Sequence, residues 1–268
     1  MQAGNWSNIR IRTAFISDLH LGTRDCQADE VCRFLTGVDM EELFLVGDVV
    51  DLWSMRGKIF WPAAHHEVLR LVMEKIRRGT RVIYIPGNHD DLARTLVGSL
   101  LAGIEVHEEF SYTTRNGRRM LVIHGDVFDG AVRFSPLLKA TGCALYGVIM
   151  VVNRQVNLVR GLLGMRRWSM ATWLKSRVGN AMAYVRRYEL AAAAAAKARG
   201  FDGIICGHIH RPHVEEIDGV LYCNDGDWVE HCTALIEDRN GELRLWQHRM
   251  EELEPLVAAQ PASLGKAA

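Results

Sequence analysis

Five short groups of aspartate, histidine and asparagine recur along the sequence, each after a run of apolar residues. In chain order they are Asp18-Leu19-His20, Gly47-Asp48-Val49-Val50-Asp51, Gly87-Asn88-His89-Asp90, His124-Gly125-Asp126 and Gly207-His208-Ile209-His210. One such group alone is typical of a polar turn that caps local backbone atoms. Five sets of oxygen and imidazole atoms at one sheet edge would be costly to bury without partners. Their recurrence therefore indicates a metal site.

The mixture of donors indicates which ions would bind. Carboxylate, amide and imidazole groups favour hard or borderline divalent ions over those that prefer thiolates. We therefore expect Mn²⁺, with Fe²⁺ or Zn²⁺ as alternatives. The groups supply more donors than one ion can use. Two ions about 3.5–4 Å apart, bridged by one carboxylate, would use them.

The apolar runs before these groups predict the strands that must hold them. Residues 82–85 are branched and aromatic and stop at Pro86-Gly87, which is typical of a buried strand ending in a turn. Runs over 11–17, 43–46, 119–123 and 203–206 predict strands that end at the other four groups. Ligands in α/β proteins collect beyond the carboxyl ends of strands, so we expect the five groups to lie together.

The rest of the chain completes an α/β pattern. With 268 residues and 49% hydrophobic content, the chain can bury a sizeable core. Asn116-Gly117 predicts a hairpin turn, and the six alanines at 191–196 favour a helix. The further elements that we expect are helices over 29–37, 63–78 and 91–102 and strands over 104–111, 220–223, 231–236 and 242–247.

In their order and spacing, the five motifs resemble those of the calcineurin-like metallophosphoesterases. The resemblance extends over about residues 12–236, apart from a long segment in the middle. It implies a mixed α/β (α+β) fold in which a β-sandwich is flanked by helices. It also implies a hydrolase of phosphate esters or pyrophosphates that uses two divalent ions.

Carried over residue by residue, the resemblance implies a ligand set. Asp18, His20 and His210 would bind one ion, Asn88, His124 and His208 would bind the second, and Asp48 would bridge the two. His89 corresponds to the family's histidine beside the phosphoryl group, and Asp51 would orient it. The implied chemistry is attack by a metal-bridging hydroxide, while His89 stabilises the phosphoryl oxygens or protonates the leaving oxygen.

Further motifs resemble the UDP-2,3-diacylglucosamine diphosphatase branch of this superfamily, which acts in lipid A biosynthesis. They are SDLHLG at 17–22, GDVVDLW at 47–53, GHIHRP at 207–212 and NDGDWVE at 224–230. The implied substrate is UDP-2,3-diacylglucosamine or a similar lipid-linked nucleotide. The chain departs from the best-established members of this branch at His89, where they carry arginine; the histidine form belongs to their close relatives. A general phosphodiesterase or phosphatase of a small substrate is therefore the alternative.

Residues 131–190 separate the fourth motif from the fifth and are strongly basic. They contain ten lysines and arginines but one acid, Glu189, interleaved with apolar residues that include Trp168 and Trp173. One interpretation is an ordinary helical pair with a solvated basic face. The other is a helical cap, apolar inside for acyl chains and basic outside for anionic lipid. Candidates for substrate binding are Arg166, Arg167, Lys175 and Arg177.

The expected organisation is a core over residues 1–130 and 191–250, interrupted by this cap and followed by a disordered tail over 251–268. The basic and aromatic residues of 131–190 could also contact a nucleic-acid strand, so a nuclease is a further alternative, although a formal net charge of zero argues against nucleic acid as a partner. The cysteines form no C-x-x-C pair and no apolar signal core is present, so we expect a cytoplasmic protein. Its substrate would be an anionic small molecule or a lipid-linked nucleotide, and no obligate protein partner is evident. The cap would allow contact with the cytoplasmic face of the inner membrane. A non-catalytic scaffold with a degenerate core is the other class, but the complete set of motifs favours an enzyme.

Overall fold

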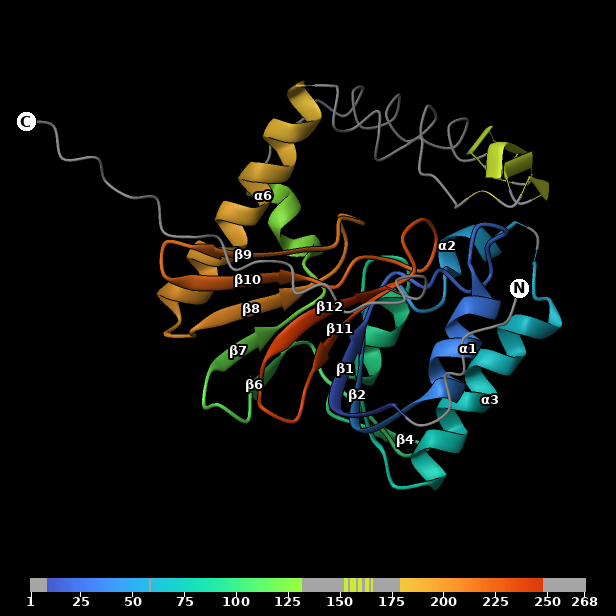
Figure 1. Ribbon diagram of the computed structural model, residues 1–268, viewed down its shortest axis with the longest axis horizontal. Helices are drawn as coiled ribbons and strands as arrows, with labels where there is room; N and C mark the ends of the chain where they lie inside the picture. The colour runs from blue at the N-terminus through green and yellow to red at the C-terminus, as the bar shows by residue number, and fades with distance from the viewer. Residues whose placement is uncertain are drawn as a thin grey trace, which may run out of the picture.

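Two β-sheets packed face to face, with helices on both outer sides, form the core of the protein (Figure 1). The computed structural model describes residues 9–57, 59–131, 152–153, 155–157, 159–160, 162–163, 165 and 179–247. The main elements are β1 (Ile9–Ile16), α1 (Ala28–Gly37), β2 (Val38–Val46), α2 (Leu52–Met55), α3 (Ala63–Arg77), β3 (Arg81–Ile85), η1 (Asp91–Leu96), β4 (Leu100–Leu101), β5 (Ile104–Val106), β6 (Phe110–Thr113), β7 (Arg119–Val122), η2 (Asp126–Ala131), α6 (Gly179–Ala198), β8 (Gly203–Cys206), β9 (His213–Ile217), β10 (Val220–Asn224), β11 (Thr233–Glu237) and β12 (Leu243–Gln247).

The larger sheet has the strand order β12-β11-β1-β2-β3-β5-β4. β1, β2, β3 and β5 run parallel, and α1 and α3 connect the first three of them on one face. Parallel strands need such crossover connections because the carboxyl end of one strand and the amino end of the next lie at opposite ends of the sheet. As a result, the loops that follow β1, β2 and β3 all leave from one edge.

The smaller sheet has the order β6-β7-β8-β10-β9, with β7, β8 and β10 parallel. The predicted hairpin at Asn116-Gly117 joins β6 and β7, which pair antiparallel. α6 leads into β8 and packs on the outer face of this sheet. The loops after β7 and β8 therefore also leave from one edge.

Alternating side chains divide the core into layers. Phe15 and Phe44 stack between the two sheets with their ring centroids 4.7 Å apart. Their neighbours Ala14, Ile16 and Leu43 belong instead to the cluster that α1 and α3 cover. Because successive residues of a strand point to opposite faces, one strand serves both layers. This explains why these strands are continuously apolar.

The sandwich is also held together toward the amino ends of β1 and β7. There the fully buried Glu237 of β11 accepts hydrogen bonds from Arg12 at 3.0 Å and from the backbone N–H of Arg115 at 2.6 Å. The hydroxyl of Tyr112, on β6, donates to the same carboxylate. These contacts join the two sheets because Arg12 and Glu237 belong to the larger sheet, whereas Tyr112 belongs to the smaller one and Arg115 to the hairpin turn between β6 and β7.

The alanine-rich helix is confirmed, and it is long. α6 buries Ala192, Ala193 and Ala196 against the smaller sheet, where small side chains allow close approach. It begins at Gly179, so it runs continuously through residue 190, where the sequence placed the end of the cap. The expected tail over 251–268 lies outside the described residues.

Two local predictions are wrong. The helix expected over 91–102 is the short 3₁₀-helix η1 followed by β4, because Gly98 adopts φ +85° and donates its N–H to the carbonyl of Val106. The strand expected over 104–111 is two strands in different sheets. The N–H of His107 still bonds Tyr84 of the larger sheet, whereas Phe110 pairs with Val122 of the smaller one. β9 was not expected from the sequence.

Candidate metal centre

The five motifs lie at the carboxyl ends of β1, β2, β3, β7 and β8, where the two sheets meet. Aspartate and histidine side chains form three close groups there: Asp18, His20 and His210; Asp48, His124 and His208; and His20, Asp51 and His89. Asn88 joins the second group through its contact with His124. The larger sheet supplies the first three motifs and the smaller sheet the last two.

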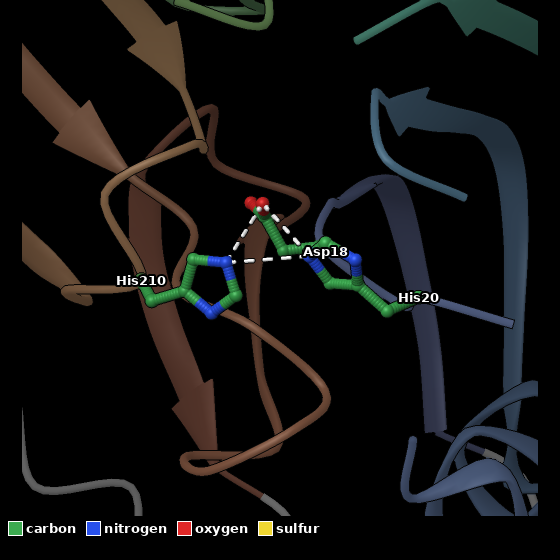
Figure 2. Close-up of side chains that lie close together, drawn as sticks. All are labelled: Asp18, His20 and His210. Atoms are coloured by element: carbon green, nitrogen blue, oxygen red, sulfur yellow. Dashed lines mark hydrogen bonds and ion pairs between the residues drawn. The ribbon is translucent and has the colours of Figure 1, made fainter. Parts of the chain in front are cut away.

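The first group is built by Asp18, His20 and His210, whose polar atoms converge on one point (Figure 2). The Nε2 atoms of the two histidines lie 3.3 Å apart. Asp18 Oδ1 lies 3.3 Å from Nε2 of His210 and 3.8 Å from Nε2 of His20. Donors about 2.0–2.2 Å from one ion stand at about such separations from each other.

Asp18 carries the clearest sign that a cation belongs there. Its side chain is completely buried, and its Oδ1 has no hydrogen-bond partner. A buried carboxylate oxygen without a donor is costly, and an ion between Asp18 and the two histidines would remove that cost. The residues present therefore fit a divalent metal.

The second group lies beside the first, and its Asp48 also faces His20 of the first group. Asp48 Oδ2 is 3.5 Å from Nε2 of His124 and 3.9 Å from Nε2 of His20. Asn88 Oδ1 is 3.3 Å from Nε2 of His124. One carboxylate oxygen thus faces both groups, an arrangement suited to bridging two ions.

The imidazoles are held by acceptors at their other nitrogen. His20 Nδ1 lies 3.1 Å from Asp51 Oδ2, and His124 Nδ1 lies 2.8 Å from the carbonyl of Val46. Such acceptors fix the tautomer and orient the free nitrogen of a metal-binding histidine. In both residues the free nitrogen is Nε2, which faces the group.

The charges around the centre are strongly coupled. Burial lowers the pKa of His20 and His124, but the surrounding carboxylates outweigh burial and raise each pKa to about 10. Burial raises the pKa of Asp18, yet the neighbouring histidines hold that pKa well below its usual value. In the absence of metal, the carboxylates therefore draw protons onto the imidazoles, as they would draw a cation.

The backbone that presents these side chains is strained. Asp18, His20, Asp48, His208 and His210 all adopt positive φ, between 50° and 71°. L-residues pay about 1–2 kcal/mol for that conformation. Strain of this kind concentrates where a site over-determines the backbone. The sequence did not reveal it.

The loops are also tied to one another. The carboxylate of Asp90 accepts from the backbone N–H groups of Gly87 at 2.6 Å and Val49 at 2.7 Å. The N–H of His89 donates to Asp48 Oδ1 at 2.8 Å. Asp90 therefore fixes the loop after β3 against the loop after β2, a role that the sequence analysis did not assign to it.

His89 lies at the edge of the centre with 28% of its side chain exposed. Its Nδ1 is 3.0 Å from Asp51 Oδ2, an ion-pair distance without hydrogen-bond alignment. The ring of Trp53, which is 44% exposed, lies over the imidazole at 4.5 Å between centroids. Asp51 and Trp53 together restrict the orientation of His89.

Two aspartates behind the first group were missed by the sequence analysis. Ser17 Oγ lies 2.5 Å from Asp18 Oδ2 and 2.6 Å from Oδ1 of the buried Asp225. Asp227 Oδ2 lies 4.0 Å from His210 Nδ1. Both belong to the stretch NDGDWVE after β10, where the available signal was a sixth polar turn after a buried strand.

The four candidate substrate-binding residues of the cap, Arg166, Arg167, Lys175 and Arg177, lie outside the described residues. Arg186, also in the basic segment, is paired with Glu189 and Glu215. Among the described residues, no helix combines the length and apolar character needed to cross a bilayer.

The chain matches the family model for calcineurin-like phosphoesterases over residues 11–212, a range that contains all five motifs. It is 29% identical over 244 residues to a UDP-2,3-diacylglucosamine hydrolase of Azotobacter vinelandii, covering 85% of this chain and 95% of that protein. A protein of the same description from Neisseria gonorrhoeae is 25% identical over 237 residues, covering 83% and 92%. Among solved structures, an archaeal phosphodiesterase is 15% identical with a TM-score of 0.43, covering 88% of this chain and 98% of that one.

Proposed function

Because the chain belongs to the calcineurin-like phosphoesterase family, we propose that its strand-end motifs hold two divalent ions and hydrolyse a lipid-linked nucleotide. The family makes the protein a metal-dependent hydrolase of phosphate esters or pyrophosphates. The observation that carries the dinuclear proposal is Asp48 Oδ2, which faces donors of both groups at 3.5 and 3.9 Å.

The proposed ligands follow the two groups. Asp18, His20 and His210 hold one ion, Asn88, His124 and His208 hold the other, and Asp48 serves both. The buried Oδ1 of Asp18, which accepts no hydrogen bond, supports the first assignment. Mn²⁺ is the ion we propose, with Fe²⁺ or Zn²⁺ compatible with the same donors.

The chemistry divides between the ions and the chain. The ions, when bound, supply Lewis acidity toward water and the phosphoryl oxygens. His89 stands beside the first group and donates a hydrogen bond to a phosphoryl oxygen or a proton to the departing oxygen. Asp51 orients both His89 and His20, so it links the acid to a ligand. The carboxylates keep the centre negative and thereby favour divalent cations.

UDP-2,3-diacylglucosamine, or a similar lipid-linked nucleotide, is the proposed substrate. The named relatives support this, because they align with this chain over nearly their whole length. The basic and apolar segment over 131–190 suits a cap that takes acyl chains and rests on an anionic membrane surface. We accordingly propose a cytoplasmic enzyme that works at the inner face of the membrane, with α6 anchoring the cap to the core.

A general phosphodiesterase is the second candidate, and His89 favours it. The best-established members of the UDP-2,3-diacylglucosamine diphosphatase branch carry arginine at this position. A guanidinium binds two phosphate oxygens at once, whereas an imidazole offers one donor. Histidine at this position therefore suits a different anion, or one that needs a single hydrogen-bond donor here.

A panel of substrates tests the choice. The purified protein with Mn²⁺ is given UDP-2,3-diacylglucosamine, UDP-N-acetylglucosamine, which has no long acyl chain, and bis(p-nitrophenyl) phosphate, and products are identified by mass spectrometry. Asp48→Ala, which should lose both ions and all turnover, is the matched control for contaminating activity. Release of UMP from the diacylated compound at much the highest kcat/KM supports the proposal. Equal kcat/KM for UDP-2,3-diacylglucosamine and UDP-N-acetylglucosamine would refute the lipid substrate and leave a general phosphodiesterase.

A further inference from the structure

A chain of hydrogen bonds connects α6 to His208. Tyr184, in the first half of α6, donates its hydroxyl proton to Asp129 Oδ1 at 2.7 Å. The same oxygen lies 3.0 Å from Nε2 of His208. Asp129 itself belongs to η2, the 3₁₀-helix that follows the fourth motif. One carboxylate therefore contacts both α6 and a proposed metal ligand.

Like His20 and His124, His208 has one ring nitrogen beside an acceptor, but in His208 this nitrogen is Nε2 and in the other two it is Nδ1. His20 and His124 have Nδ1 beside an acceptor and Nε2 facing the centre. In His208 it is Nε2 that lies beside the carboxylate of Asp129, which leaves Nδ1 for the group with Asp48 and His124. A proton on Nε2, held by Asp129, keeps the Nδ1 lone pair available.

Close packing supports the same contact. Tyr188 lies one turn after Tyr184 on α6, with its ring centroid 6.1 Å from that of His208 and 5.7 Å from that of Phe128. A Cβ added at Gly125 would overlap the hydroxyl of Tyr188. α6 is thus seated directly against η2 and the loop of His208, without room for rearrangement.

We propose that Asp129 is a positioning residue that fixes His208 for the second ion and makes binding of that ion depend on the docking of α6. The inference rests on the proposed function, because it requires His208 to be a ligand. Since α6 packs against η2 and the loop of His208, the docking of α6 and the binding of the second ion are energetically linked. Linkage is reciprocal, so binding of the ion also stabilises the seating of α6.

Metal binding to three full-length variants tests the proposal. Asp129→Asn keeps the shape but removes the charge. Tyr184→Phe keeps Asp129 and removes only the contact from α6. Asp202→Asn is the matched control, since it makes the same change between α6 and β8, where Asp202 accepts a hydrogen bond from the backbone N–H of Arg119 at 2.8 Å. Each protein is equilibrated with Mn²⁺ at buffered free concentrations, and bound ions per chain are counted. Circular dichroism and thermal unfolding report whether the fold is kept.

Two ions should bind the unaltered protein. Asp129→Asn should weaken one of them about 10–100-fold and leave the other unchanged. Tyr184→Phe should weaken the same ion about fivefold, as expected for one lost hydrogen bond. The double variant should weaken it by less than the product of the two effects, because both act through His208. Asp202→Asn should bind both ions normally.

Hydrogen exchange supplies a readout that a purely structural role would not change. Saturating Mn²⁺ should slow exchange of the α6 amides in the unaltered protein and have less effect in Asp129→Asn. Unchanged affinity in both Asp129→Asn and Tyr184→Phe would overturn the proposal while leaving the dinuclear centre intact. Equal weakening of both ions would assign Asp129 a general electrostatic effect and also overturn it. Binding of only one ion by the unaltered protein would refute the proposed centre itself.

Discussion

Gly87 is the position at which a single methyl group should disable the centre. A Cβ at Gly87 would overlap Oδ1 of Asp48 and lie 2.6 Å from the backbone nitrogen of Asp48 and 2.8 Å from Nε2 of His124. The backbone at Gly87 has no positive φ, so Gly87→Ala introduces no conformational strain of its own. The whole effect therefore comes from displacement of Asp48 and His124.

The magnitude follows from the overlap. Asp48 Oδ1 would have to move by about 1 Å to reach van der Waals distance from the new methyl group. That movement breaks its 2.8 Å hydrogen bond from the N–H of His89 and shifts Oδ2 away from both groups. A displacement of about 1 Å typically costs about 10²-fold in rate. Overpacking in a tight core costs about 1–3 kcal/mol of unfolding free energy.

The assay compares Gly87→Ala with Gly57→Ala, because a Cβ at Gly57 meets nothing within 4 Å. We expect Gly87→Ala to bind fewer than two Mn²⁺ ions per chain and to lose about 10²-fold or more in kcat on bis(p-nitrophenyl) phosphate. Gly57→Ala should keep both properties. If Gly87→Ala keeps two ions and normal turnover, Asp48 does not occupy the shared position that the structure gives it, and the reasoning fails.

Four further outcomes are expected. His89→Ala and His89→Gln should keep both ions, while kcat falls about 10²–10⁴-fold because no imidazole remains to donate a proton; an unchanged kcat would reduce His89 to a packing residue. Metal affinity should rise about tenfold per pH unit for each ion between about pH 7 and pH 9. The reason is that His20 and His124, each with a pKa of about 10, are protonated in this range, so each ion must displace a proton. Titrations showing no pH dependence would contradict those protonation states. The same raised pKa values stabilise the metal-free fold fully below the unfolded histidine value of about 6.5, so its melting temperature should fall as pH rises toward about 10. Replacing residues 132–178 by a Gly-Ser linker, which spares α6, should raise KM steeply for a diacylated substrate at about 0.8 kcal/mol per lost methylene contact and leave bis(p-nitrophenyl) phosphate hydrolysis unchanged; equal loss on both substrates would mean that the segment only supports the fold.

The strand ends could be predicted from sequence because each motif combines two local signals. An apolar run predicts the strand, and the turn after it supplies the donors. The parallel sheets then bring distant motifs together without further information. This is why Asp18 and His210 could be expected in one place although 192 positions separate them.

What the sequence did not show depends on contacts made only in the folded chain. The sequence does not distinguish Asp129 from other acidic residues, because its contact with Tyr184 forms only when α6 packs in the fold. The same holds for Asp225, whose partner Ser17 is distant in the sequence. The helix expected over 91–102 failed for a similar reason. Its leucine spacing suits a helix, but Gly98 and the free edge of β5 offer the backbone a different set of partners.

The division of the donors between the two sheets has a mechanical consequence. Asp18, His20, Asp48 and Asn88 extend from the larger sheet, whereas His124, His208 and His210 extend from the smaller one. With ions in the proposed positions, the coordination bonds cross-link the two sheets. The hydrogen bonds to Glu237 connect the same two sheets near the other end of the sandwich. Sliding one sheet over the other would therefore have to break or distort the bonds of the proposed metal centre. Removing the ions with a chelator should lower the resistance to such sliding at that end of the sandwich alone.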